Sequence, residues 1–330
     1  MRNIEYSDIC CTWRCSLRCP TCGSFKRDQE MELSVKQIDH ICESFPNLKD
    51  IVLEGGSPFL WKNLFYFCDK MKKDGRNIAI ITNGVAEARI KKWIDTFGAY
   101  TKNFSFNVSL NGIGEIHDIS RGVKGVYEKT LRSAIALRQA GFPVSFSFVP
   151  FAENVDHYVL VRDLAKKHDI GVGICYPCES AKFGENMFWH YIPKESVHEI
   201  RRNVLNQRKL PKNPRRWFRY FMAGWINDYF DSSVLKKKVM PCDAGKEMMH
   251  INPDGTIRPC CFDESMEIGK VTDEGVIWTG LLKKHKKRIP NKCQYAQGDV
   301  CNACFIGYTL WSRPFRILWW RIKEVVKWQS

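Results

Sequence analysis

The sequence predicts an α/β protein in which a partial (β/α)6 TIM-like barrel precedes a small cysteine-rich β-hairpin/α domain. Strand-like and helix-like segments alternate from residue 5 to about residue 178, which is typical of a parallel sheet covered by helices. Later in the chain, Pro253-Asp254-Gly255 is a hairpin-turn signal between two strand-like runs. Cysteines gather before residue 23 and again after residue 241, so each part has its own cysteine group.

The elements of the barrel follow from hydrophobic periodicity. After a first strand near residue 5, further strands are expected at Asp50–Glu54, Asn77–Thr82, Asn103–Leu110, Val144–Val149 and Gly171–Tyr176. Helices are expected at Leu64–Lys73, Glu87–Phe97, Tyr127–Ala140 and Val155–His168, the third of them closed by Gly141. In barrels of this type the active site lies at the C-terminal ends of the strands.

The composition indicates a cytoplasmic protein that handles a metal or a cluster. The chain has 330 residues, enough for about two domains, and its 44% hydrophobic and 26% charged residues are ordinary for a globular protein. It shows neither a signal peptide nor an apolar run long enough to span a membrane. Without export, the 15 cysteines are better explained by metal or cluster chemistry than by disulfides.

Positive charge is concentrated in the last part of the chain. Residues 1–200 have 26 Lys/Arg against 24 Asp/Glu, whereas residues 201–330 have 25 against 12. The net charge of +13 in the second part indicates either an anionic partner, which could be nucleic acid, an anionic membrane surface or an acidic substrate, or a charge that only keeps the protein soluble.

Cys15, Cys19 and Cys22 form a C-x3-C-x2-C run directly after the first predicted strand. Three thiolates on one short loop can hold three irons of a [4Fe–4S] cube, which leaves the fourth iron open for a small molecule. The alternatives are a zinc knuckle that lacks a ligand and buried thiols grouped by chance.

Four further segments accompany this run, and together they resemble the radical S-adenosylmethionine (SAM) superfamily. They are Glu54-Gly55-Gly56-Ser57-Pro58, Thr82-Asn83-Gly84, Ser109-Leu110-Asn111-Gly112 and His117-Asp118-x-x-Arg121-Gly122. Each follows a predicted strand or its loop. Two positions depart from the family pattern, because Ser57 replaces a usual Glu and Asn111 a usual Asp.

The resemblance implies a role for each segment. The backbone of Gly55, Gly56, Ser57 and Pro58 would bind the amino group of SAM, and glycine would allow its close approach. Ser109 would contact the methionyl part or the ribose of SAM, and Asn83 and Asn111 are expected to belong to the same binding site. Arg121 would hold the carboxylate of SAM. Arg121 could alternatively be a solvated arginine of a helix.

The second cysteine group resembles the auxiliary iron–sulfur domains of the SPASM and twitch type. Cys242 is followed after 12 residues by Gly255 and then by Cys260, and Cys301-x2-Cys304 supplies two more thiolates. These four would close a second [4Fe–4S] cube. The alternative is a zinc ribbon, which also uses four thiolate ligands.

One auxiliary cluster is expected rather than two. The full SPASM pattern needs about seven cysteines in this region, and the chain has six, with a spacing after Cys293 that does not match. The shorter twitch form is therefore favoured, with Cys261 and Cys293 as spare thiols or alternative ligands. Cys175 and Cys178 flank the end of the sixth strand, where a thiol could serve the reaction or simply pack.

The expected domain bounds are 1–180 for the barrel, 181–240 for an aromatic and basic connecting region that covers the substrate, 241–308 for the cluster domain and 309–330 for an amphipathic helix. Within 313–330 an apolar stripe with Trp at its border and basic flanks would suit an anionic membrane interface, so the protein could lie peripherally at the inner membrane face. Docking of this stripe on the protein itself is the commoner outcome.

The resemblance implies an enzyme that reductively cleaves SAM to a 5′-deoxyadenosyl radical and abstracts hydrogen from a substrate C–H bond. Its partners would be SAM, an external electron donor such as flavodoxin or ferredoxin, and an unidentified substrate. A cluster that begins at residue 15 is expected to leave no room for a preceding leader-binding domain, which favours a sugar or lipid-linked glycan, or a peptide recognised in another way. A peptide or protein maturase is the first alternative, and a zinc-binding module that reads nucleic acid is the second.

Overall fold

The computed structural model describes residues 4–98, 102–175, 244–245, 247–261 and 266–279. Met1–Tyr191 and Gly245–Lys284 form one compact unit, to which almost all of these residues belong. Several predictions lie outside the described residues, namely those for Cys178, Cys242, Cys293, Cys301, Cys304, the region 181–240 and the helix within 309–330. They stay predictions.

Six parallel strands form the barrel part of the sheet, as the alternation predicts. They are β1 (Tyr6–Cys10), β2 (Asp50–Glu54), β3 (Asn77–Thr82), β4 (Phe104–Ser109), β5 (Val144–Phe148) and β6 (Gly171–Ile174). Each pairs with the next in chain order. The predicted partial barrel with a parallel sheet is confirmed.

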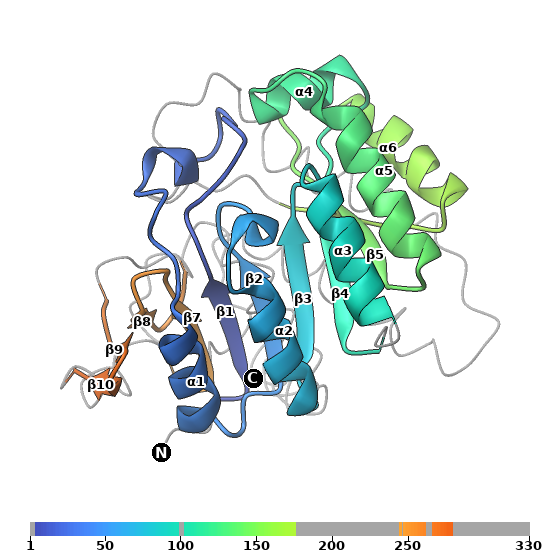
Figure 1. Ribbon diagram of the computed structural model, residues 1–330. Helices are drawn as coiled ribbons and strands as arrows, with labels where there is room; N and C mark the ends of the chain where they lie inside the picture. Colours follow the sequence, from blue (N-terminus) through green and yellow to red (C-terminus); the bar gives the residue numbers. More distant parts are fainter. Residues whose placement is uncertain (1–3, 99–101, 176–243, 246, 262–265, 280–330) are drawn as a thin grey trace, which may run out of the picture. The chain divides into compact units, whose positions relative to one another are not determined.

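Helices connect these strands and cover one face of the sheet (Figure 1). They are α1 (Val35–Ser44), α2 (Leu64–Lys73), α3 (Glu87–Phe97), α4 (Glu115–Arg121), α5 (Val126–Gln139) and α6 (His157–Lys167), with short 3-10 turns η1 (Ser24–Lys26) and η2 (Pro58–Leu60). The predicted bounds of α2 and α3 are the observed ones. Gly141, with φ +92°, follows α5 as expected.

Two helices escaped the sequence analysis. Helix α1 begins with a capping box, in which Ser34 Oγ accepts from Gln37 N and Gln37 Oε1 accepts from Ser34 N. The pattern Ser-x-x-Gln is a signal that could have located it. Helix α4 has seven residues and lies between two glycines, Gly114 and Gly122, so its periodicity is too short to read.

An aromatic core lies between the helices and β4. Trp93 of α3 meets Phe104 and Phe106 edge-on, with ring centroids 4.8 and 5.0 Å apart, and all three side chains are buried. On β4 the alternating residues Ser105, Asn107 and Ser109 therefore point to the other face. We call this face, which lies opposite the helices, the inner face.

The predicted hairpin is present, and it continues the barrel sheet. Strands β7 (Met248–Ile251) and β8 (Thr256–Arg258) flank the predicted turn, and β9 (Gly269–Thr272) and β10 (Gly275–Trp278) extend it in antiparallel fashion. Because β7 pairs in parallel with β1, one ten-stranded sheet runs in the order β10-β9-β8-β7-β1-β2-β3-β4-β5-β6. The hairpin is thus joined directly to the first barrel strand.

Four further cysteines pack in the core. Cys10, Cys11, Cys42 and Cys68 are buried and form no disulfide. Burial raises the pKa of Cys68 to about 12, so this thiol stays protonated and acts as a small apolar side chain.

Candidate functional site

The three cysteines of the first motif come together on the loop that follows β1. Cys19 is buried with Leu17 and Val126 in a small apolar cluster, and Cys15 and Cys22 pack against this cluster. Val126 begins helix α5, so the loop rests on an element more than 100 residues later in the chain. We call residues 11–22, with these three cysteines, the cysteine loop.

Backbone and side-chain donors point at the sulfur atoms. Leu17 N lies 3.4 Å from Cys15 Sγ and Ser24 N lies 3.5 Å from Cys22 Sγ, so each sulfur accepts an amide hydrogen bond. Cys19 Sγ lies 4.0 Å from Nη1 of Arg121. Donors to sulfur are a general feature of iron–sulfur sites, where they stabilise the negative charge of the thiolates and tune the potential.

The surroundings keep the thiols of Cys15 and Cys19 protonated until they gain ligands. Burial raises the pKa of Cys15 to about 11. Burial also raises the pKa of Cys19, and the nearby Arg121 guanidinium opposes that shift. Because the ligand form is the thiolate, binding of a metal or cluster here releases protons.

Within the part of the chain that the structure describes, no three His, Cys, Asp or Glu side chains are spaced to hold a single metal ion. In a [4Fe–4S] cube, by contrast, each thiolate binds a different iron, so the sulfurs need not converge on one point. Three thiolates on one loop, with donors to their sulfurs, are a donor set that fits a cube with one open iron.

The Gly55–Pro58 segment packs directly against the cysteine loop. Gly56 N donates to Thr12 O at 2.7 Å, and Ser57 N donates to Arg14 O at 2.8 Å. A Cβ at Gly56 would lie 2.5 Å from the carbonyl oxygens of Trp13 and Arg14. The glycine is therefore required by the approach of two backbones, whereas the sequence suggested the approach of a ligand; the predicted role of this segment toward SAM remains a proposal.

Two buried donors have no partner among the described residues. One is Nε of Arg121, whose guanidinium lies beside Cys19, and the other is Asn83 Nδ2, two residues before Val85, which packs against the cluster around Cys19. Asn83 Oδ1 is already used, because it accepts from Val85 N at 3.0 Å. Buried donors normally have acceptors, so this place suits a ligand rich in oxygen acceptors, such as one that carries a carboxylate.

Helix α4 is held at the cysteine loop by its last residues. Arg18 N donates to Arg121 O at 3.0 Å, and Gly122 adopts a left-handed conformation with φ +64° directly against Arg18. A Cβ at Gly122 would lie 2.2 Å from Arg18 O. The Arg-Gly pair thus positions the guanidinium beside Cys19 and lets the two segments touch.

Asn111 and His117 have structural partners in this structure. Asn111 Oδ1 accepts from Val149 N at 3.2 Å, and Asn111 N donates to His117 Nδ1, also at 3.2 Å. Ser109, by contrast, lies on the inner face at the C-terminal end of β4, in register with Ser147 of β5. The asparagine therefore joins the ends of β4 and β5, and any contact of Asn111 with SAM remains a proposal.

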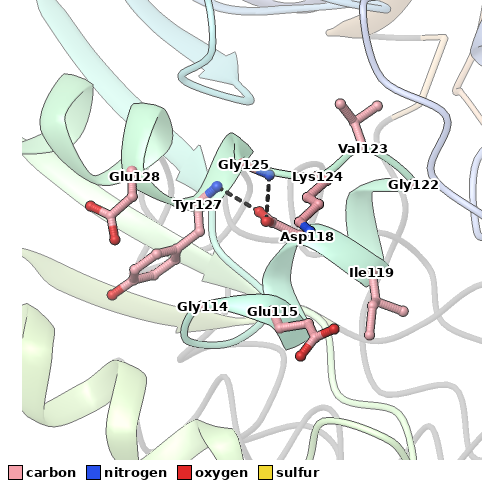
Figure 2. Close-up of a pocket in the computed structure, with 10 residues that line it drawn as sticks. All are labelled: Gly114, Glu115, Asp118, Ile119, Gly122, Val123, Lys124, Gly125, Tyr127 and Glu128. Atoms are coloured by element: carbon pink, nitrogen blue, oxygen red, sulfur yellow. Dashed lines mark hydrogen bonds between the residues drawn. The ribbon is translucent and has the colours of Figure 1, made fainter.

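Asp118 fastens the start of helix α5. Its Oδ1 accepts from Val126 N at 3.0 Å and from Tyr127 N at 2.8 Å, and its Oδ2 accepts from Gly125 N at 2.5 Å (Figure 2). A carboxylate at a helix N-terminus satisfies free amides and complements the helix dipole. Asp118 thus acts as a remote cap, and it sets the position of Val126 under Cys19.

A pocket of about 550 Å³ opens beside this cap. Figure 2 shows Glu115 and Glu128 among the side chains that line it, with Asp118 turned toward the amides of Gly125 and Tyr127. Its lining includes Gly122 and Val123 but none of the residues predicted to bind SAM. The pocket therefore lies behind the segment that supports the cysteine loop and is distinct from the predicted cofactor site.

Gln29 ties both ends of the cysteine loop together, and no sequence signal identified it. Its Oε1 accepts from Cys15 N at 2.9 Å, and its Nε2 donates to the carbonyls of Ser24 and Arg27 at 3.1 and 2.9 Å. Since Ser24 in turn bonds Cys22, one side-chain amide fixes the backbone next to two of the three cysteines.

We expect Gln29→Ala to lower iron loading of the cysteine loop, because three hydrogen bonds of ~0.5–1.5 kcal/mol each are lost. Iron and sulfide analysis after anaerobic reconstitution checks this. Gln37→Ala is a matched control: Gln37 also uses both ends of its amide, with Ser34 N and Val271 O, but away from the cysteines. Equal iron content in both variants would show that Gln29 only stabilises the fold.

The buried His117 should make the free energy of unfolding sensitive to acid. Burial, together with the nearby Arg121, lowers its pKa to about 2, so the native state keeps the ring neutral. Below pH 6.5 the unfolded chain takes up a proton that the native state does not, so stability falls as pH falls. Between pH 7.5 and pH 6.0 the loss should be roughly 0.8 kcal/mol.

Denaturant unfolding of His117→Asn at both pH values isolates this contribution, because an Asn oxygen can still accept from Asn111 N. The variant should lose less stability than the unsubstituted protein by that amount. An equal loss in both proteins would contradict a buried neutral His117.

Cys260 and Cys261 are the described cysteines of the second group. They follow β8 and are half-buried. The residues proposed to complete their cluster lie outside the described part, so this ligand set stays a prediction.

Among the described helices, none combines the length and the apolar character that crossing a bilayer requires.

Comparisons with known proteins agree with the two cysteine groups. A model of the radical SAM superfamily matches residues 9–165. A model of an iron–sulfur cluster-binding domain, SPASM, matches residues 242–305. The first match includes the cysteine loop and strands β2 to β5, and the second includes the hairpin that joins β1. Both resemblances stated for the sequence are confirmed.

Relatives are similar along different shares of the chain. The antilisterial bacteriocin subtilosin biosynthesis protein AlbA of Bacillus subtilis (strain 168) is 24% identical over 315 residues, which is 90% of this chain and 64% of that protein. Pre-heme d1 synthase of Dinoroseobacter shibae is 29% identical over 147 residues, 43% of this chain and 36% of that protein. The chain therefore spans less than two thirds of the length of either.

A solved structure shares the fold. Native anSMEcpe with bound AdoMet and Kp18Cys peptide superimposes with a TM-score of 0.60 and 15% identity, over 95% of this chain and 98% of that one. At this identity the similarity concerns the arrangement of the chain and leaves the chemistry to be argued.

Proposed function

Because the chain belongs to the radical SAM superfamily and carries a C-terminal SPASM domain, we propose that it is an enzyme that uses SAM to abstract hydrogen from a C–H bond of a peptide. The observation that carries the proposal is the cysteine loop, which has three thiols, amide donors to sulfur and, beside Cys19, the unsatisfied buried Nε of Arg121.

The chain's own residues have distinct tasks in this proposal. Cys15, Cys19 and Cys22 hold the first cluster, and Arg121 and Asn83 offer donors to the carboxylate of SAM. The backbone of Gly55–Pro58 and the side chain of Ser109 lie at the ends of β2 and β4, where the rest of SAM would bind. When bound, the cluster and SAM supply the electron and the organic radical. The barrel binds, orients and excludes water.

A second cluster belongs to the proposal. Cys242, Cys260, Cys301 and Cys304 would hold an auxiliary [4Fe–4S] cluster, with Cys261 and Cys293 as alternative ligands. An electron donor of the flavodoxin or ferredoxin type would reach the first cluster. Exposed Arg18 lies within the cysteine loop and exposed Lys26 follows it, and their charge suits the acidic surface of such a donor.

Of the two substrate classes expected from the sequence, a sugar or glycan and a peptide, the similarities favour the peptide. The relative matched along nine-tenths of the chain is named for bacteriocin biosynthesis, and the structure with the same fold binds a peptide. The relative named for heme synthesis matches less than half of the chain. These similarities support a peptide substrate, and heme-type chemistry is the second candidate.

Transfer of deuterium tests the substrate class. Reconstituted protein, SAM and a reductant are incubated with perdeuterated cell extract that has been separated into peptide and carbohydrate fractions. The proposal expects 5′-deoxyadenosine to form and to carry deuterium only with the peptide fraction. Deuterium from the carbohydrate fraction alone would restore the glycan hypothesis, and stoichiometric zinc with no SAM cleavage would support the nucleic-acid-binding module.

A further inference from the structure

Strand β6 is the last strand of the sheet in the described part of the chain. Cys175 N, directly after it, donates to Phe148 O of β5 at 2.8 Å. Because the amide and carbonyl groups of successive strand residues point in opposite directions, those of Val172 and Ile174 point away from β5. Among the described residues, no strand pairs with this outer edge.

Two glycines leave the inner face of β6 without side chains at their positions. Gly171 and Gly173 are exposed and stand in register with Ser145 and Ser147. Neither has a left-handed φ, and a Cβ on either would meet only ordinary contacts, at 3.4 Å or more. Local geometry therefore does not require glycine here, although glycine weakens a strand. In strands, such glycines often mark the close approach of a ligand or another backbone.

The edge leads to the predicted SAM site. Ser147 pairs with Ser109 on one side and with Gly173 on the other. At the end of β6, Cys175 Sγ lies 3.0 Å from Ser147 Oγ. A chain added along β6 would become the next strand of the sheet, and its end beside Cys175 would lie at the same edge of the sheet as the C-terminal ends of β4 and β5, where the proposed chemistry takes place.

We infer that the outer edge of β6 binds the substrate peptide as an added strand, by backbone hydrogen bonds to Val172 and Ile174. This inference rests on the proposed function and specifies how its peptide binds. An unpaired strand edge presents alternating donors and acceptors that match an extended peptide. The side-chain-free inner face at Gly171 and Gly173 leaves room for peptide side chains to turn toward the SAM site.

The test separates the backbone amide from the side chain at one residue. Val172→Pro removes the outward N–H and leaves the bonds to β5 intact, as proline is tolerated on edge strands. Val172→Ala also removes most of the valine side chain but keeps the backbone N–H. As the probe, random 12-residue peptides displayed on their own mRNA are selected anaerobically against the reconstituted, SAM-loaded protein.

Selected peptides should bind Val172→Pro at least ten times more weakly than the unsubstituted protein, and Val172→Ala within about twofold. Gly173→Val should also weaken binding without lowering the melting temperature, since valine favours strands. N-methylation along a selected peptide should weaken binding at every second residue, because alternate amides face β6.

Formation of 5′-deoxyadenosine without peptide is measured for each variant. Unchanged formation in Val172→Pro separates a failure of peptide docking from a failure of the proposed function. The inference is overturned if no peptide survives selection or if the Pro and Ala variants bind equally. It is also overturned if gel filtration shows that Val172→Pro splits a dimer, which would assign the edge to a second copy of this chain.

Discussion

Replacement of Cys15, Cys19 and Cys22 together by Ala should abolish 5′-deoxyadenosine formation and leave about four of the ~8 irons expected for two cubes. The physical reason is that these thiolates are proposed as the entire protein ligand set of the first cluster. Without them no open iron remains to bind SAM. Anaerobic reconstitution, iron and sulfide analysis and chromatography of the products give both readouts.

A matched control is available in the core. Cys68→Ala removes a thiol of the same kind, fully buried in α2 and distant from the loop in the chain. It should cost stability through the small cavity left behind but keep the iron content and SAM cleavage unchanged. If the triple variant cleaved SAM at the unsubstituted rate, the assignment of the first cluster would be wrong.

Loss of the second thiolate pair should have the opposite pattern. Replacing Cys301 and Cys304 by Ala should spare cleavage of SAM in the absence of substrate and stop substrate turnover. Full turnover without the pair would rule out an essential auxiliary cluster.

Gly122→Ala should displace the cysteine loop from helix α4. The added Cβ would lie 2.2 Å from Arg18 O, and alanine would have to adopt φ +64°. The strain costs about 1 kcal/mol and overpacking a further 1–3 kcal/mol. Because Arg18 N bonds Arg121 O at the same place, we expect lower stability together with weaker SAM binding and lower iron loading.

Gly125→Ala separates the clash from the strain. Gly125 has a similar φ, +76°, but its Cβ would have nothing within 4 Å. This variant should cost only the conformational term, about 1 kcal/mol, and should keep SAM affinity. Denaturant unfolding and anaerobic SAM titration of both variants provide the comparison. Equal effects on SAM affinity would mean that the contact between Gly122 and Arg18 does not support the site.

The sequence by itself determined the barrel, the hairpin and the cysteine loop, because each depends on local patterns. Alternating periods along the chain identify strands such as Asn77–Thr82 and helices such as Glu87–Phe97. A turn type fixes the hairpin at Pro253-Asp254-Gly255, and three ligands within eight residues need no distant partner.

Only the tertiary structure decided the contacts between segments far apart in the chain. Three such contacts have no sequence pattern that could predict them. They are the pairing of β7 with β1, the packing of Val126 against Cys19, and the hydrogen bonds of Gln29 to Cys15 and Ser24. Gly56 illustrates the difference. Its sequence motif suggests that glycine makes room for a ligand, whereas in the structure glycine is needed because the backbone of Arg14 lies so close to it. Such contacts depend on which surfaces meet when the chain closes on itself, and that is decided by packing across the whole sheet.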